Sequence, residues 1–261
     1  MNQNITILQK AAALLESGKN IHIVTVVEAG GNTPAESGKK MIVPDSGPPY
    51  GTIGGGGLER EAQQYCRSSE KKSVELHTCD LAELGMTCGG QVTLMYEFFT
   101  GRVFFVLFGG GHVGSALAPI LESLGYTVII ADNREKIIEH HQNAGRTALL
   151  CSYRDISCAD SYLSSGFCFI ASHNHEYDTV ILEQLLERKT IAFSYIGMIG
   201  SKNKVRQAFE ELQQKGFTIP GTVYAPVGIN IGGGAPAEIA VSIASEIVAV
   251  THGRVVPHMR R

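Results

Sequence analysis

The chain has 261 residues, which is enough for one large domain or two domains of ordinary size. Hydrophobic residues make up 44% and charged residues 18%, and the formal net charge is −3, so composition and charge predict a globular protein without a nucleic-acid partner. No segment approaches the roughly 18 apolar residues of a membrane span, and the first residues lack the order of a signal peptide. We therefore expect a cytoplasmic protein with no membrane partner.

The first hundred residues predict a smaller α+β domain. Apolar residues recur at helical spacing between residues 5 and 15, and Gly18 is typical of a helix C-cap. The spacing and composition of the following segments predict strands over 21–27, 39–43, 50–53, 73–79 and 91–99, and a helix over 58–66. Residues 100–102 are a short hinge, so the predicted domains are 1–100 and 101–261.

The most informative stretch begins with the apolar strand predicted over 103–108. It enters a G-x-G-x-x-G pattern at Gly109, Gly111 and Gly114, and His112 lies inside this loop. In such a loop the first glycine permits a tight turn, the second lets the backbone approach a pyrophosphate, and the third lets helix and strand pack closely. The N–H groups that begin the next helix favour phosphate, so we predict a dinucleotide-binding loop.

The acid that ends the second strand of this unit bears on the choice of nucleotide. Asp132 is placed to bond a ribose hydroxyl, which favours NAD over NADP. Arg134 keeps NADP open, because an arginine near this point can take a 2′-phosphate. The alternative is a glycine-rich turn in a doubly wound sheet that binds nothing.

Strands and helices alternate through the rest of the chain, which predicts a Rossmann-like parallel sheet with helices on both faces. The fold class is therefore α/β, a parallel-sheet domain preceded by the smaller domain. Beyond the first strand, further strands are predicted over 127–131, 147–150, 167–171 and 192–196, and helices over 113–124, 135–141, 179–188, 202–215 and 237–251.

Polar residues follow two of these strands at the edge where ligands bind. His173 and His175 are two apart, and with Asp178 they could bind a metal or perform acid–base chemistry. The alternative, which we favour, is a polar loop that orients the cofactor and caps the next helix. Gly200 and Ser201 open another helix and predict either an anion site or a plain N-cap.

The first domain carries two further candidates. Glycines 54–57 (Gly54, Gly55 and Gly56 leading into Gly57) open a helix with Glu59 in its first turn, and they form a candidate nest for a phosphate or a pterin. Cys88 is followed by Gly89 and Gly90, so its thiol could stay accessible as a nucleophile or a soft-metal ligand. The alternative is an ordinary cysteine in a turn.

The chain has six cysteines, and no two are spaced as C-x-x-C, so the sequence predicts no structural zinc site. In a reducing compartment we expect thiols, most of them buried. The six are Cys66, Cys79, Cys88, Cys151, Cys158 and Cys168.

These motifs, taken in order over nearly the whole chain, resemble the XdhC/CoxI family of xanthine dehydrogenase accessory factors. Each motif is short, and the ordered set is specific. The motifs are Gly31-Asn32-Thr33-Pro34, with Gly38 and Met41; Gly51-Thr52-Ile53-Gly54-Gly55-Gly56, with Glu59; Met86-Thr87-Cys88-Gly89-Gly90; 108–114; 173–178; 195–201; 226–228; and Pro236-Ala237-Glu238-Ile239-Ala240.

The resemblance implies a protein that binds the molybdenum cofactor as a transient ligand, supports its sulfuration and hands it to an apo molybdenum hydroxylase. It implies that Cys88 contacts molybdenum or sulfur, beside Glu59 and the glycine loop at 54–57. It also implies a homodimer, and a cysteine desulfurase as a second partner. Many relatives have a cysteine where this chain has Gly57, so here Cys88 would act alone, or the chain would serve a related maturation step.

Two other functions stay open at this point. In an NAD(P)-dependent oxidoreductase, His173, His175 or Asp178 would act near the nicotinamide; no Tyr-x-x-x-Lys pair follows the glycine loop to support that. In a non-catalytic NAD sensor, nucleotide state would tune the docking of a partner. The resemblance favours an accessory protein over a stand-alone dehydrogenase.

Overall fold

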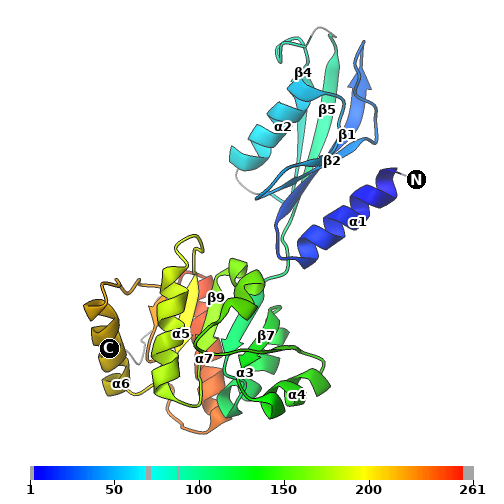
Figure 1. Cartoon of the computed structure of the whole chain (residues 1–261). Coiled ribbons are helices and arrows are strands. Elements are labelled where there is room, and N and C mark those ends of the chain that lie inside the picture. The colour runs from blue at the N-terminus through cyan, green and yellow to red at the C-terminus, as the bar shows by residue number, and fades with distance from the viewer. Residues whose placement is uncertain (1–2, 69–71, 87–88, 255–261) are drawn as a thin grey trace. The chain divides into compact units, whose positions relative to one another are not determined.

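The computed structural model describes residues 3–68, 72–86 and 89–254. The chain divides into two compact units, an N-terminal unit of residues 1–102 and a C-terminal unit of residues 103–261 (Figure 1). Among the described helices, none is long and apolar enough to cross a membrane.

The N-terminal unit is built on a five-stranded sheet with the order β3-β2-β1-β5-β4, and all of its pairs are antiparallel. The long central strand β1 pairs with β2 on one side and β5 on the other, with a register shift between Val26 and Glu28. The strands are β1 (Ile21–Gly30), β2 (Lys40–Pro44), β3 (Tyr50–Gly51), β4 (Val74–Asp80) and β5 (Gln91–Phe99).

Two helices cover the two faces of this sheet. Side chains alternate along β1, so Ile21 and Ile23 pack with α1 (Gln3–Glu16) while Val24 and Val26 pack with α2 (Gly56–Ser68). Figure 1 shows α1 and α2 on opposite sides of the strands. This order confirms the predicted α+β character of the first domain.

The C-terminal unit is built on a six-stranded sheet with the order β11-β10-β9-β6-β7-β8, and every pair is parallel. The central strand β6 is buried along its whole length, as expected of a parallel sheet covered on both faces. The strands are β6 (Phe104–Phe108), β7 (Thr127–Asp132), β8 (Thr147–Leu150), β9 (Phe167–Ile170), β10 (Tyr195–Met198) and β11 (Val223–Tyr224).

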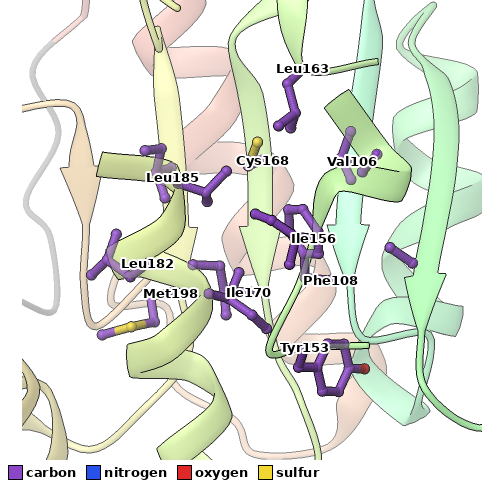
Figure 2. Packing of buried hydrophobic residues seen from close by; sticks show 14 of the residues in the cluster. Val106, Phe108, Tyr153, Ile156, Leu163, Cys168, Ile170, Leu182, Leu185 and Met198 are labelled. Atoms are coloured by element: carbon purple, nitrogen blue, oxygen red, sulfur yellow. The ribbon is translucent and has the colours of Figure 1, made fainter. Parts of the chain in front are cut away.

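Alternating residues of β6 divide the core between the two faces of the sheet. Val106 and Phe108 pack under η1, α5 and α6, where Figure 2 shows them among Ile170, Leu182 and Leu185. The neighbouring positions of β6 face α3, α4 and α7. The helices are α3 (His112–Ser123), α4 (Glu135–Asn143), the 3₁₀ helix η1 (Ser157–Ser165), α5 (His175–Glu187), α6 (Lys202–Gln214) and α7 (Pro236–Thr251). The predicted α/β fold class is thus confirmed.

Four local features differ from the sequence predictions. The strand expected over 192–196 begins at Tyr195, because the N–H groups of Ser194 and Tyr195 both donate to the Gly166 carbonyl before the chain enters the sheet. Sequence reasoning missed η1, whose short turn has no 3.6-residue period, and the two-residue strand β11.

The fourth difference is a disulfide. Cys151 and Cys158 are bonded to each other, so the expectation that every cysteine is a thiol is wrong for this pair. Their side chains meet because the chain turns back after β8 and enters η1 seven residues later. Cys66, Cys79 and Cys168 are free.

Candidate functional site

The glycine loop of the C-terminal unit follows β6 and leads directly into α3. Gly109 adopts a positive φ of 115°, and a side chain there would collide with the carbonyl oxygen of Ala171 after β9. A side chain at Gly114 would collide with the carbonyl oxygen of Gly109. The loop therefore needs glycine at both positions to pack between β9 and the first turn of α3.

The N-terminus of α3 opens into a cavity, which we call the glycine-loop cavity. Gly111 is the N-cap residue and no side chain caps the helix, so its first N–H groups are available to an anion. The cavity has a volume of about 810 Å³. Its lining combines the loop with the segments after β7, β9 and β10: Gly111, His112, Val113, Gly114, Ser115, Ala116, Arg134, Ile137, His140, Ala171, Ser172, His173, Ile199 and Pro236.

A buried histidine, His141, contacts the backbone of the glycine loop. His141 Nε2 lies 2.9 Å from the Gly110 carbonyl oxygen, which also accepts a hydrogen bond of 2.8 Å from Ser115 Oγ. Among the residues the structure describes, His141 Nδ1 is buried without a partner, which fits a neutral ring that donates through Nε2. Burial lowers the pKa of His141 and favours that neutral form.

Asp132 is the acid at the end of β7, and its carboxylate is completely buried. Oδ1 accepts from the backbone N–H of Arg134 at 3.0 Å and from its Nε at 2.8 Å, while Oδ2 accepts from Arg134 Nη2 at 2.7 Å and Gly110 N at 2.9 Å. Burial raises the pKa of Asp132, but these hydrogen bonds outweigh burial and hold it below its ordinary value. Its partners are therefore Arg134 and the glycine loop, whereas the sequence predicted a ribose hydroxyl.

A second cavity of about 850 Å³ lies beyond β7 and β8, and we call it the Arg134 cavity. It shares Arg134 and Ile137 with the glycine-loop cavity. Sequence reasoning missed most of its lining, although a loop that follows a parallel strand is a general signal for ligand contact. The lining residues are Asn133, Arg134, Glu135, Lys136, Ile137, Leu150, Cys151, Ser152, Tyr153, Arg154 and Tyr177.

The polar loop after β9 is held by its own hydrogen bonds, and it places His173 at the glycine-loop cavity. The Asp178 carboxylate accepts from the backbone N–H of Ser172 at 2.8 Å, and Asn174 caps α5. Burial raises the pKa of Asp178. His173 lines the glycine-loop cavity, while His175 is exposed at the start of α5.

The structure does not support the metal hypothesis for this loop. Within the described part of the chain, no group of three His, Cys, Asp or Glu side chains is arranged to hold a metal ion. The Asp178 carboxylate accepts its hydrogen bond from Ser172, and His175 lies near enough to influence its pKa. Asn174 caps α5 as the favoured interpretation predicts, and the role of the loop in orienting a cofactor stays a prediction.

Gly200 and Ser201 follow β10, and neither of them lines the glycine-loop cavity. Ser201 is the N-cap of α6, where its hydroxyl accepts from Lys204 N at 3.4 Å. Gly200 lines a third cavity of about 270 Å³, which shares Ile199 with the glycine-loop cavity. The arrangement is that of a plain N-cap beside the main cavity.

In the N-terminal unit, Glu59 braces the glycine loop that begins α2. Its Oε1 accepts from Thr52 Oγ1 at 2.5 Å and from Ile53 N at 3.4 Å, and Gly54 N donates to Thr52 Oγ1 at 3.3 Å. Gly54 and Gly55 both have positive φ, which re-aims the backbone before the helix. The carboxylate thus fixes the loop shape.

The other motif glycines of this unit gather around the same loop. A Cβ at Gly57 would lie 2.9 Å from Met86 Cγ, and one at Gly31 would lie 3.0 Å from Gly90 Cα. Gly57 therefore packs against the Met86 side chain. Cys88 itself lies outside the described residues, and the described neighbours on its two sides, Met86 and Gly89–Gly90, border this region.

Two protein-family models match the chain. The model of the XdhC Rossmann domain matches residues 105–247, and the model of the XdhC and CoxI family matches residues 14–77. The first covers the parallel sheet with the glycine loop, and the second covers β1 to β3, α2 and part of β4.

The chain is also similar to individual proteins. Uncharacterized protein YqeB of Escherichia coli (strain K12) is 29% identical over 256 residues, which cover 94% of this chain and 46% of YqeB. A probable xanthine dehydrogenase subunit of Bacillus subtilis (strain 168) is 27% identical over 144 residues, covering 55% of this chain and 41% of that protein. The chain thus spans less than half the length of these curated relatives.

A solved structure shares the fold. The crystal structure of a xanthine dehydrogenase from Bacillus halodurans matches with a TM-score of 0.63 at 20% identity, covering 97% of this chain and 68% of that chain. At this identity the likeness concerns the fold alone.

Proposed function

The chain belongs to the XdhC and CoxI family, and from that premise we propose that it is an accessory factor for a xanthine dehydrogenase-type molybdenum hydroxylase. In this proposal the N-terminal unit handles the molybdenum cofactor and the C-terminal unit binds a dinucleotide. The observation that carries it is the gathering of the family's motif residues at two places, the loop at Gly54–Gly57 and the loop at Gly109–Gly114.

The N-terminal unit fits the phosphate of a molybdopterin. The first N–H groups of α2 have no partner within the helix, and Glu59 holds the preceding glycines in a fixed turn. Met86 places a thioether sulfur beside this loop, and we assign the contact to molybdenum or sulfur to the more nucleophilic thiol of Cys88. When bound, the cofactor supplies the metal-centred oxo and sulfido chemistry of the client enzyme, and this chain's residues bind and shield it.

The C-terminal unit fits a dinucleotide of the NAD or NADP type. The glycine loop and the uncapped N-terminus of α3 offer backbone donors to a pyrophosphate, and both large cavities adjoin this point. His173 would lie beside the ligand in the glycine-loop cavity. We propose that the nucleotide stabilises a form of the chain competent to receive or release the cofactor.

The partners follow from the same premise. One relative bears the name of a xanthine dehydrogenase subunit, which supports an apo molybdenum hydroxylase as the client. We further propose that a cysteine desulfurase supplies the sulfur, that the chain acts as a homodimer and that it works in the cytoplasm. Co-purification of the native protein from its own cells tests the desulfurase, its mass in solution tests the homodimer, and cell fractionation tests the location.

The direct experiment measures pterin and molybdenum on the chain purified from cells that make the cofactor. We expect bound pterin in the unaltered chain and a loss of at least half of it in Cys88→Ala. Cys79→Ala is the control, because its thiol is a free one in the same unit that packs beside the core. Pterin at the level of an unrelated protein would refute the proposal, and NAD(P)H turnover with small carbonyl compounds would favour the oxidoreductase alternative.

A further inference from the structure

The residues of the Arg134 cavity bear on a question that the proposed function leaves open, namely whether the chain binds NAD(H) or NADP(H). Resting on the proposed binding of a dinucleotide, we propose that this cavity binds the 2′-phosphate of an adenosine ribose, so that the chain selects NADP(H) over NAD(H). The proposal reverses the sequence-based preference for NAD. Its evidence is the set of hydrogen bonds that Asp132 accepts and the cationic side chains around Arg134.

Asp132, the acid at the end of β7, has no acceptor positions left for the ribose hydroxyls of NAD. An acid that recognises NAD must offer carboxylate oxygens to the ribose hydroxyls. The Asp132 carboxylate has no exposed surface, and its two oxygens already accept four hydrogen bonds from Arg134 and Gly110. A carboxylate has about four acceptor positions, so a ribose hydroxyl could bind only by displacing Arg134.

Arg134 is held in place with donors to spare. A guanidinium carries five N–H groups in a fixed plane, and Asp132 engages its Nε and Nη2. The side chain is 38% exposed, and Nη2 lies 3.4 Å from the Cβ position of Gly111. The remaining donors therefore stand at the junction of the two cavities, beside the turn that would bind the pyrophosphate. Planar guanidinium groups suit phosphate oxygens.

Other groups of the Arg134 cavity strengthen the attraction for a phosphate. Lys136 and Arg154 line it with Arg134, against the single carboxylate of Glu135. The N-terminus of α4 begins at the same wall, and no side chain caps it. Its free N–H groups and the positive end of its dipole add to the three cations.

A buried hydroxyl provides an independent pointer to a ligand. Tyr153 is 1% exposed and lines this cavity, and in Figure 2 its ring lies beyond the arrowhead ends of the strands. Its hydroxyl makes no hydrogen bond of ordinary length and angle within the described residues, although the Asp132 carboxylate and the Asn133 backbone lie close enough to influence its pKa. Buried hydroxyls are normally satisfied, so a phosphate oxygen bound beside Arg134 would compete with Asp132 for this donor.

The test titrates the full chain by calorimetry with NADP⁺, NAD⁺ and 2′,5′-ADP. We expect NADP⁺ to bind at least about tenfold more tightly than NAD⁺, because charged hydrogen bonds to a phosphate are strong. That preference should shrink as salt is raised, since the cations are partly exposed. The isolated 2′,5′-ADP should compete with NADP⁺ for the same site.

Substitutions assign the preference to this cavity. Arg134→Gln removes the central donor, but it also leaves Asp132 buried without its partner. The combined change Lys136→Gln and Arg154→Gln alters only exposed side chains, and it should lower NADP⁺ affinity about tenfold with NAD⁺ affinity nearly unchanged. Lys189→Gln, an exposed cation outside both cavities, is the matched control and should change neither affinity.

The outcomes separate this inference from the proposed function. Equal affinity for NAD⁺ and NADP⁺, or tighter binding of NAD⁺, would overturn the 2′-phosphate assignment and leave dinucleotide binding intact. An NADP⁺ preference that survives the double substitution would place the phosphate elsewhere and would also overturn it. If neither nucleotide binds, the proposed dinucleotide function itself fails.

Discussion

Replacing Asp132 with asparagine tests the hydrogen-bond arrangement at the end of β7. The asparagine keeps one acceptor oxygen, so two of the four hydrogen bonds that Asp132 accepts are lost and an amide N–H₂ faces the donors of Arg134 or Gly110. Arg134 is partly exposed and can turn to water, which limits the penalty. We expect Asp132→Asn to lower the free energy of unfolding by about 3 kcal/mol.

The measurement is urea unfolding of the full chain followed by circular dichroism, with the two units fitted as separate transitions. Glu122→Gln is the matched control, because Glu122 also forms a two-point ion pair with Arg146 but is 38% exposed. That change should cost under about 1 kcal/mol. Equal effects of the two substitutions would refute the reasoning from burial.

The difference in free energy of unfolding between the native chain and Asp132→Asn should depend on pH. Burial raises the pKa of Asp132, but the bonds from Arg134 and Gly110 outweigh it and hold the folded-state pKa below the unfolded value. The carboxylate therefore adds stability that is complete above pH about 4 and is lost as the pH falls through the lower folded value. The difference between the native chain and Asp132→Asn should be largest near neutral pH and shrink in acid.

Three further predictions concern the glycine loop and its surroundings. Gly114→Ala should abolish measurable dinucleotide binding in calorimetry, because its methyl group would collide with the Gly109 carbonyl oxygen. Burial lowers the pKa of His141, so the native chain should lose urea stability as the pH falls below about 6.5, and His141→Gln should flatten that dependence; parallel curves would contradict this. Cys151→Ser opens the small ring closed with Cys158, and it should cost about 2 kcal/mol more in urea under oxidising conditions than under reducing ones, where only the burial of a hydroxyl remains.

Much of the fold could be predicted because its local patterns have clear physical causes. The apolar run at Phe104–Phe108 and the alternation along β1 follow from burial on two faces, and both sheets formed as expected. The glycine loop was found from sequence because backbone contacts at Gly109 and Gly114 exclude any side chain. The family could be identified because its short motifs occur in the expected order along the chain.

The site could be predicted only in part, because its remaining features depend on contacts between distant segments. Asp132 was expected to face a ribose, and sequence gives no sign that Arg134 takes up its acceptor positions. Tyr153 and Arg154 reach the cavity from a loop without regular periodicity. The Cys151–Cys158 disulfide depends on how the chain turns into η1, which spacing alone does not determine.

The central claim is that this chain delivers a molybdenum cofactor to an apo-enzyme. The most direct measurement incubates an apo xanthine dehydrogenase from the same cells with the cofactor-loaded chain and follows hydroxylase turnover. We predict turnover that requires the loaded chain and falls sharply with Cys88→Ala. Equal recovery with free cofactor alone, or none with the loaded chain, would contradict the account.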